Sequence, residues 1–362
     1  MIPLAELPTP TLLVDLDRLE RNIASMAGAF AAAGVGLRPH IKTSKCWEVA
    51  RRQLDAGAIG FTCSTAVEVA WLQSRGVTDL LWAHVPIGPR KVAFVVDSIA
   101  RHGGGLTVSL DSVEAARPLS VAAEAAGVTV PFVLEVDTGH GRLGVEPSAA
   151  IATAAGIAAL PGLRLRGVLT HEGHISALAE RSDLERAGAA AGTLLVSIAE
   201  DLRAAEFAVE VVSVGSTPGA TSAPFVPGVT EGRPGTYVYF DGNQIRLGSC
   251  TLDQCAQTVL ARVASVRRAG RPIIDAGVKA MSSDTIAVAG GVGLVLDRPG
   301  VTFPEANEEH GFLHEGDADP LAVGDLVRLV PNHACGTTNM WSHLYAVRGD
   351  MAVERWEISA RY

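Results

Sequence analysis

The sequence predicts an α/β protein made of a (β/α)8 TIM-type barrel and a second, C-terminal β domain. Between about residue 35 and residue 241, eight short apolar runs alternate with Ala- and Leu-rich helical patterns, which is typical of the βα units of a closed parallel barrel. After Cys250 the runs become rich in Val, Ile and Leu and are broken by Gly, Pro and Asp, which indicates strands. We therefore expect a barrel domain over residues 1–250 and a β domain over residues 251–362.

The eight runs are the expected barrel strands, in chain order: Leu37–Ile41, Ile59–Cys63, Leu80–His84, Leu106–Leu110, Phe132–Val136, Leu165–Thr170, Val211–Val214 and Thr236–Phe240. An open, doubly wound sheet would alternate with helices in the same way. The barrel is favoured because polar side chains follow most of the runs, and the strand ends of a barrel converge on one mouth. These side chains are Lys42, Ser64, His84, Asp111, Asp137, His171 and Ser216.

The β domain is expected to contain five apolar segments: Thr258–Val266, Pro272–Asp275, Val292–Leu296, Leu326–Val330 and Tyr345–Ile358. One segment from the start of the chain, Thr11–Leu16, precedes the first barrel strand. We expect the first ~16 residues to pair with the β domain.

Composition excludes several classes of function. The chain has 362 residues, a formal net charge of -9 and 5% aromatic residues, which argues against a nucleic-acid partner. We find neither a run of roughly 20 apolar residues nor an export signal, so we expect a cytoplasmic protein without membrane contact. Five cysteines, an odd number, fit reduced thiols better than a disulfide framework.

Lys42 is the first candidate catalytic residue. It lies in the segment Arg38–Thr43 at the end of an expected strand. A lysine amine inside a cleft and beside other cationic groups can form a Schiff base. From this segment alone, a solvated surface lysine next to Lys45 is the alternative.

Two turns near the last expected strands are candidate phosphate sites. Gly215, Ser216 and Thr217 follow the run that ends at Val214, and a second turn contains Arg233, Gly235, Thr236 and Tyr237. Glycine-rich turns with hydroxyl side chains present backbone N–H groups to an anion, and TIM barrels commonly bind phosphate at their late strands. A Schiff-base lysine combined with a phosphate site describes a pyridoxal 5'-phosphate site.

The chain resembles the fold-type III pyridoxal phosphate enzymes, which have an alanine racemase-like N-terminal barrel, and among them the D-threonine aldolase and D-serine dehydratase family. The matching segments occur in order along nearly the whole chain. They are Thr9–Asp15, Arg38–Thr43, Asp137–Val145, Thr170–His174, Gly215–Pro218, Arg233–Val238, Asp275–Gly277, Glu308–Gly311 and Pro331–Cys335.

The resemblance implies a role for each matched residue. Lys42 would carry the cofactor, Arg142 would lie near its phenolic oxygen and His171 would pack beside its ring. Arg233 or a neighbour would face the pyridine nitrogen, and a guanidinium there would keep this nitrogen unprotonated because it accepts no hydrogen bond. For both arginines, a structural ion pair is the alternative.

His333 and Cys335 are the expected metal ligands. Two residues that are two apart on an extended segment point to the same side, and imidazole with thiolate favours zinc. The spacing alone is commonly coincidental. The resemblance strengthens it, because the family holds a divalent ion through a His-x-Cys or His-x-Asp pair; the Cys form resembles the zinc-dependent dehydratases and the Asp form the manganese-using aldolases.

The sequence therefore predicts a pyridoxal phosphate- and metal-dependent lyase for D-configured β-hydroxy-α-amino acids, acting by dehydration as D-serine dehydratase does. A D-threonine aldolase is the alternative, and it would need a base for the β-hydroxyl: His84, His171 or His174. A racemase or a non-catalytic cofactor carrier is less favoured. By resemblance, we also expect a homodimer.

Overall fold

The computed structural model describes residues 1–284 and 291–361, and the contacts within the chain divide it into two compact units. Unit 1 consists of Met1–Met26, Thr43–Arg52 and Thr236–Arg361, and unit 2 contains Ala27–Lys42 and Gln53–Gly235. The expected boundary between the two domains at residue 250 divides the chain into two continuous segments, and it stays a prediction.

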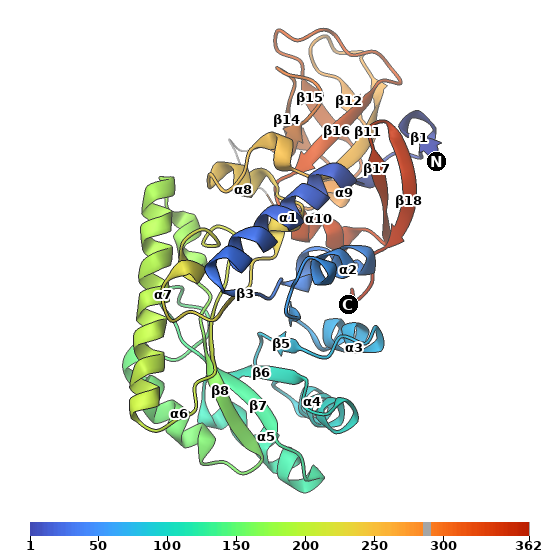
Figure 1. The fold of residues 1–362 in the computed structure, drawn as a ribbon. Coiled ribbons are helices and arrows are strands. Elements are labelled where there is room, and N and C mark those ends of the chain that lie inside the picture. Colours follow the sequence, from blue (N-terminus) through green and yellow to red (C-terminus); the bar gives the residue numbers. More distant parts are fainter. Residues whose placement is uncertain (285–290, 362) are drawn as a thin grey trace. The chain divides into compact units, whose positions relative to one another are not determined.

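Unit 2 contains, within its described residues, a sheet of eight parallel strands in the order β3-β10-β9-β8-β7-β6-β5-β4 (Figure 1). The strands are β3 (Gly36–Leu37), β4 (Phe61–Cys63), β5 (Leu80–Trp82), β6 (Leu106–Leu110), β7 (Val130–Glu135), β8 (Leu163–Leu169), β9 (Val211–Val214) and β10 (Glu231–Gly232). The two edges of the sheet meet where His40 pairs with Thr62 in a parallel bridge and the Thr62 N–H donates to Pro39 O at 2.8 Å. The predicted barrel with a β domain is confirmed.

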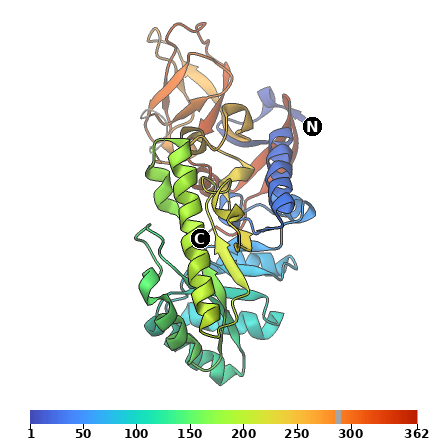
Figure 2. The same cartoon turned by 60° about the vertical axis from the view of Figure 1, so that its left-hand side comes forward.

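From β4 to β9, an α-helix connects each strand to the next, and Figure 1 shows α4 and α5 on the outside of this sheet. Ser112 begins α5 by accepting a hydrogen bond from Ala115 N, and Gly127, with φ of 64°, ends it in the left-handed conformation that favours glycine. Figure 2 turns the long helix α7 to the front. The α-helices that begin before or within the barrel are α1 (Leu16–Ala33), α2 (Trp47–Asp55), α3 (Ala66–Ser74), α4 (Pro89–His102), α5 (Val113–Ala126), α6 (Ala150–Ala158) and α7 (Arg181–Ala204).

Two expected strands are corrected by the structure. The run Thr236–Phe240 is not a strand: residues Thr236–Val238 form a 3-10 turn, η6, and the eighth strand is β10, which lies earlier in the chain. Similarly, β3 ends at Leu37, and Ile41–Thr43 form the 3-10 turn η2. Both runs are apolar because they are largely buried, and burial alone does not distinguish a helical turn from a strand.

Unit 1 contains the C-terminal β structure. Within the described residues, β11, β12, β15, β14, β13 and β16 pair in a closed ring, and β2 lies between β11 and β17. Strands β14 and β15 were not expected from the sequence. The strands are β1 (Ile2–Pro3), β2 (Thr11–Asp15), β11 (Gln257–Ser265), β12 (Ile273–Ile274), β13 (Gly293–Val295), β14 (Thr302–Ala306), β15 (Gly311–His314), β16 (Leu326–Pro331), β17 (His343–Arg348) and β18 (Met351–Glu357). The short helices are α8 (Gly242–Arg246), α9 (Val278–Met281) and α10 (Ala334–Met340).

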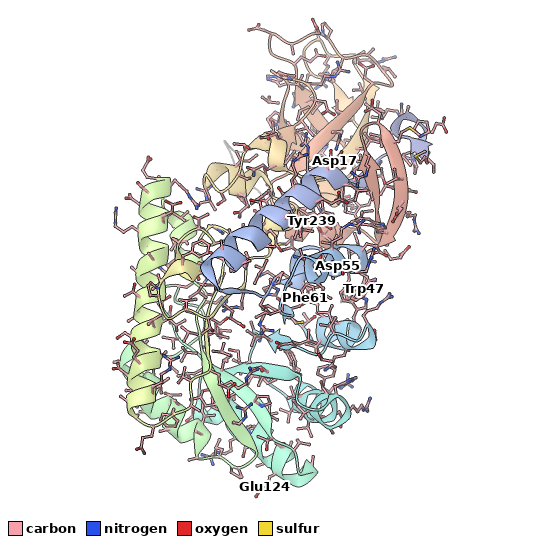
Figure 3. The ribbon with its side chains drawn as sticks, viewed as in Figure 1. Asp17, Trp47, Asp55, Phe61, Glu124 and Tyr239 are labelled. Atoms are coloured by element: carbon pink, nitrogen blue, oxygen red, sulfur yellow. The ribbon has the colours of Figure 1, made fainter. Side chains whose placement is uncertain are left out.

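Each unit has its own apolar core. In unit 2, Leu81 of β5, Val133 of β7 and Leu169 of β8 form a cluster of buried apolar residues. Figure 3 contrasts the fully buried Phe61 of β4 with Glu124, an exposed residue of α5. In unit 1, a separate cluster includes Leu13 and Leu260 of the paired strands β2 and β11. No helix in the described part of the chain is long and apolar enough to span a membrane.

A buried ion pair joins the first and last barrel strands of unit 2. Arg38 Nε lies 2.9 Å from Glu231 Oε2, and both residues are buried. The Ser213 hydroxyl also donates to Glu231, at 2.7 Å, and Arg38 Nη1 reaches Asp79 at 2.8 Å.

We expect Arg38→Met to lower the free energy of unfolding by about 3–5 kcal/mol, because it leaves the Glu231 carboxylate buried without its cation. The matched control is Arg164→Met, which breaks an exposed pair with Glu210 and should cost at most about 1 kcal/mol. Urea denaturation followed by circular dichroism measures both. Equal effects of the two substitutions would contradict a special role of the buried Arg38–Glu231 pair in stability.

Candidate active site

Lys42 lies in the turn η2, directly after the closure point of the barrel in unit 2. The His40 N–H donates to Pro234 O at 3.0 Å, and His40 Nε2 lies 3.3 Å from the Ser64 hydroxyl. Burial lowers the pKa of His40 well below its ordinary value, and the charges of Lys42, Arg233 and Arg142, with His171, lower it further. Side chains that follow β3, β8 and β10, and one from the loop after β7, therefore lie around one neutral imidazole.

Arg233 is buried beneath this group of side chains. Its Nη1 donates to Ser213 Oγ at 2.5 Å and its Nη2 donates to Thr170 O at 2.6 Å. Burial lowers its pKa, although the carboxylates of Glu231, Glu172 and Glu135 act in the opposite direction. The two hydrogen bonds use two of the five N–H groups of a guanidinium. The contact with a pyridine nitrogen stays a prediction.

His171 is held as a neutral imidazole. Its Nδ1 lies 2.5 Å from Gly215 O, and because a carbonyl only accepts hydrogen bonds, we assign the proton to Nδ1 and leave a lone pair on Nε2. Burial first, and then the charge of Arg142, lower the pKa of His171 to about 3. The His140 ring meets it edge-on at 5.4 Å. A Cβ on Gly173 would come within 2.9 Å of both rings, so a larger residue there would force the rings to move.

A hydrogen bond within unit 2 joins the two predicted phosphate turns. Gly235 N donates to Thr217 Oγ1 at 3.2 Å. Gly215 N and Ser216 Oγ both donate to the buried Glu172, at 3.1 and 2.8 Å. A Cβ on Gly215 would lie 2.9 Å from Arg233 Cβ, so this glycine lets the turn pack on the guanidinium.

Glu172 was missed as a functional residue in the sequence, although it lies between His171 and Gly173 in a matching segment. Its side chain fixes the turn after β9 from the loop after β8. A lone glutamate carries no sequence signal for this role; only the parallel pairing of the neighbouring strands β8 and β9 brings it to Ser216.

The remaining expected residues of unit 2 take different positions. Arg142 is half-exposed, with its Nη2 3.8 Å from Glu135 Oε1; burial raises the pKa of Glu135. His84 is exposed, with its Nδ1 3.2 Å from Val85 O. His174 lies in the 3-10 turn η4 (Gly173–Ala177), and its Nδ1 is buried without a hydrogen-bond partner among the described residues.

His333 and Cys335 lie together in unit 1 at the start of α10. His333 is the extended residue before the helix and Cys335 lies in the first turn, and their side chains are within hydrogen-bond reach. We expected the two side chains to point to the same side of one extended segment. The structure instead places them where an extended residue leads into a helix. Thr43 Oγ1 lies 3.1 Å from Cys335 Sγ, and Thr236 Oγ1 lies 3.8 Å from it.

Tyr237, the last residue of the second predicted turn, is fully buried in η6 of unit 1. A role of Thr236 and Tyr237 in phosphate binding stays a prediction.

Two carboxylates that were missed in the sequence support the pair His333 and Cys335. Asp241 is fully buried and accepts hydrogen bonds from Ala334 N at 2.8 Å and Gln244 N at 2.9 Å, which fixes the start of α10. Burial raises its pKa to about 6. Asp284 Oδ2 lies 2.7 Å from His333 Nδ1. Burial by itself lowers the pKa of His333. The neighbouring Cys335, Asp241 and Asp284 outweigh this effect and raise the pKa of His333 to about 10.

The donor set of unit 1 fits a borderline cation. An imidazole and a thiol in contact are typical zinc ligands, and a metal ion would displace their protons. The described residues contain no group of three or more His, Cys, Asp or Glu side chains that could hold a metal ion. An ion held by this pair alone would therefore leave positions open for water or substrate.

Comparisons with known families agree with both parts of the chain. The alanine racemase N-terminal domain matches residues 14–243, and a putative serine dehydratase domain matches residues 256–347. The chain belongs to the fold-type III pyridoxal phosphate family, with these two domains in this order. The predicted resemblance is confirmed.

Curated relatives and solved structures cover nearly the whole chain. A D-threo-3-hydroxyaspartate dehydratase from Delftia sp. is 38% identical over 98% of each chain, and a D-threonine aldolase from Arthrobacter sp. is 32% identical over 99% of this chain and 94% of its own. The structure of the Delftia enzyme has a TM-score of 0.92 with 37% identity over 99% of both chains. The D-threonine aldolase of Filomicrobium marinum has a TM-score of 0.90 with 30% identity, covering 99% of this chain and 97% of its own.

The neutral His171 should make the fold sensitive to acid. The unfolded chain binds a proton on this imidazole below its ordinary pKa of 6.5, whereas the folded chain binds it only near pH 3. The unfolded state thus binds more protons in this window. As the pH falls from 6.5 toward 3, the free energy of unfolding should fall by up to about 1.4 kcal/mol per pH unit from this residue.

Urea denaturation of His171→Asn between about pH 6.5 and pH 5 should give a shallower loss of stability than the wild type by that amount. His84→Asn, which replaces an exposed histidine of the same unit, is the matched control. If the His171→Asn and wild-type slopes coincide, His171 is not held neutral in the folded protein.

Proposed function

We propose that the chain is a pyridoxal phosphate- and divalent-metal-dependent lyase that acts on D-β-hydroxy-α-amino acids by dehydration. The observation that carries the proposal is the presence in one chain of two chemically distinct sets of side chains. One is the group of Lys42, Arg142, His171 and Arg233 at strand ends of a closed barrel. The other is the pair His333 and Cys335.

The residues of unit 2 fit the cofactor. The glycine-lined turn over Arg233, which a Cβ at Gly215 would obstruct, is suited to an anionic phosphate. Lys42 would bind the cofactor through its amine, with Arg142 and His171 beside it. Once bound, pyridoxal phosphate supplies an electron sink for negative charge at the substrate Cα.

In dehydration, the Lys42 amine, once the substrate amine has replaced it, would take the Cα proton, and the β-hydroxyl would leave with its bonding electron pair and take up a proton to become water. Addition of water then releases ammonia and gives a 2-oxo acid. The ion held by His333 and Cys335 would supply Lewis acidity toward a hydroxyl group. Zinc is favoured for an imidazole and thiolate pair, and manganese is the alternative.

Retro-aldol cleavage to glycine and an aldehyde is the second candidate function. It is favoured by the unprotonated Nε2 that we assign to His171, since a neutral imidazole could accept the proton of a β-hydroxyl. His84 is a poorer base for this reaction because it is exposed and lies beside its own neighbour Val85. Dehydration is preferred because the metal pair contains Cys335, and because the 38% identical Delftia relative is a dehydratase.

The relatives also widen the choice of substrate. D-Serine is the substrate that the sequence predicts, and the Delftia relative adds D-threo-3-hydroxyaspartate. We propose both as substrates to test, with D-threonine as the substrate for the aldolase reaction. The homodimer remains a prediction from the resemblance.

The test incubates the protein, loaded with pyridoxal phosphate and zinc or manganese, with each of the three amino acids. We expect a 2-oxo acid and ammonia from D-serine or D-threo-3-hydroxyaspartate, and at least a tenfold loss of rate after chelation, because at least 1.4 kcal/mol of barrier lowering would be lost. Glycine with an aldehyde would support the aldolase instead. An unchanged rate after chelation would contradict the metal, and the absence of every product would contradict the lyase.

A further inference from the structure

Asp284 contacts the outer nitrogen of one expected metal ligand. Its Oδ2 lies 2.7 Å from His333 Nδ1, and the His333 side chain keeps 39% of its surface exposed. Because this contact uses Nδ1, the lone pair available for a metal ion is the one on Nε2. In protein metal sites, a carboxylate that receives the second ring N–H of a histidine ligand fixes both its tautomer and its ring orientation.

The backbone next to Asp284 is in a conformation that L-residues rarely adopt. Ser282 has φ of 73° and ψ of 164°, a region populated almost only by glycine, which costs of order 1–3 kcal/mol. Its hydroxyl lies 3.4 Å from Asp284 N. Strain of this kind persists only where the surrounding structure holds it in place.

A second anchor comes from the residue before His333. The buried Asn332 donates from Nδ2 to Asp284 O at 3.0 Å and to Gly291 O at 2.8 Å. The segment between β16 and α10, which carries His333, thus also holds the backbone of Asp284. An ordinary ion pair at the surface would need neither the backbone strain at Ser282 nor the hydrogen bonds from Asn332.

We propose that Asp284 is a positioning residue for the metal site. It orients the His333 ring so that Nε2 faces the ion, and in this way it sets the affinity for the metal. Asp284 itself is not a metal ligand in this arrangement. The inference rests on the proposed function, because it needs an ion at His333 and Cys335.

The experiment titrates the metal-free protein with Co²⁺, a spectroscopic substitute for zinc, and follows the thiolate-to-cobalt absorption that a bound Cys335 would give. Competition with a chelator gives the affinity for zinc. We expect Asp284→Asn to weaken both affinities by about 10- to 100-fold. At saturating Co²⁺ the absorption should return, because Cys335 is intact.

Asp319→Asn is the matched control, since it removes the same charge from an exposed position of unit 1 and should bind Co²⁺ as the wild type does. Circular dichroism of the metal-free variants checks folding. If Asp284→Asn does not fold, Asp284→Glu decides: it keeps the charge but moves the carboxylate, and it should still bind more weakly than the wild type.

The outcomes separate this inference from the proposed function. Wild-type affinity in Asp284→Asn, or in Asp284→Glu where that variant decides, would overturn the role of Asp284 and leave the metal site intact. If the wild-type protein gave no thiolate-to-cobalt absorption, the metal part of the proposed function would fail, and this inference would fail with it.

Discussion

Closure of the parallel sheet in unit 2 is the constraint on which the candidate cofactor site depends. The bridge between His40 and Thr62 joins the first expected strand to its neighbour, and the bond from His40 N to Pro234 O joins it to the segment after the last strand. Lys42 and Arg233 are far apart in the chain, yet closure brings both beside the same imidazole, His40. Without the β3–β10 pairing, they would lie on opposite edges of the sheet.

The charges of unit 2 are arranged to receive an anion. Arg233 is buried against Ser213 and Thr170, and the imidazoles beside it are held neutral by burial and by the surrounding cations. Glu172 satisfies the donors that shape the turn after β9. In unit 1 the equivalent task falls to Asp241 and Asp284, which fix the helix start and the ring of His333. In both units, buried or half-buried carboxylates support the residues that the sequence singles out.

The sequence predicted the class of fold and the residues that carry chemistry better than it predicted the carboxylates that hold those residues in place. Alternation of apolar runs and helical patterns indicated the barrel, but Thr236–Phe240 was taken for a strand because burial makes a 3-10 turn as apolar as a strand. Glu172 and Asp284 act through contacts with residues more than 40 positions away. No local pattern encodes such contacts, so single acidic residues between strands were not recognised.

If Lys42 carries the cofactor, reduction with borohydride should attach the cofactor to this residue irreversibly. The protein loaded with pyridoxal phosphate is reduced, digested and analysed by peptide mass spectrometry, with Lys42→Ala as the control. We expect a pyridoxyl group on Lys42 in the wild type and its absence from the corresponding peptide of the variant. A modification on Lys45 instead, or an unmodified Lys42 in the loaded protein, would contradict this role of Lys42.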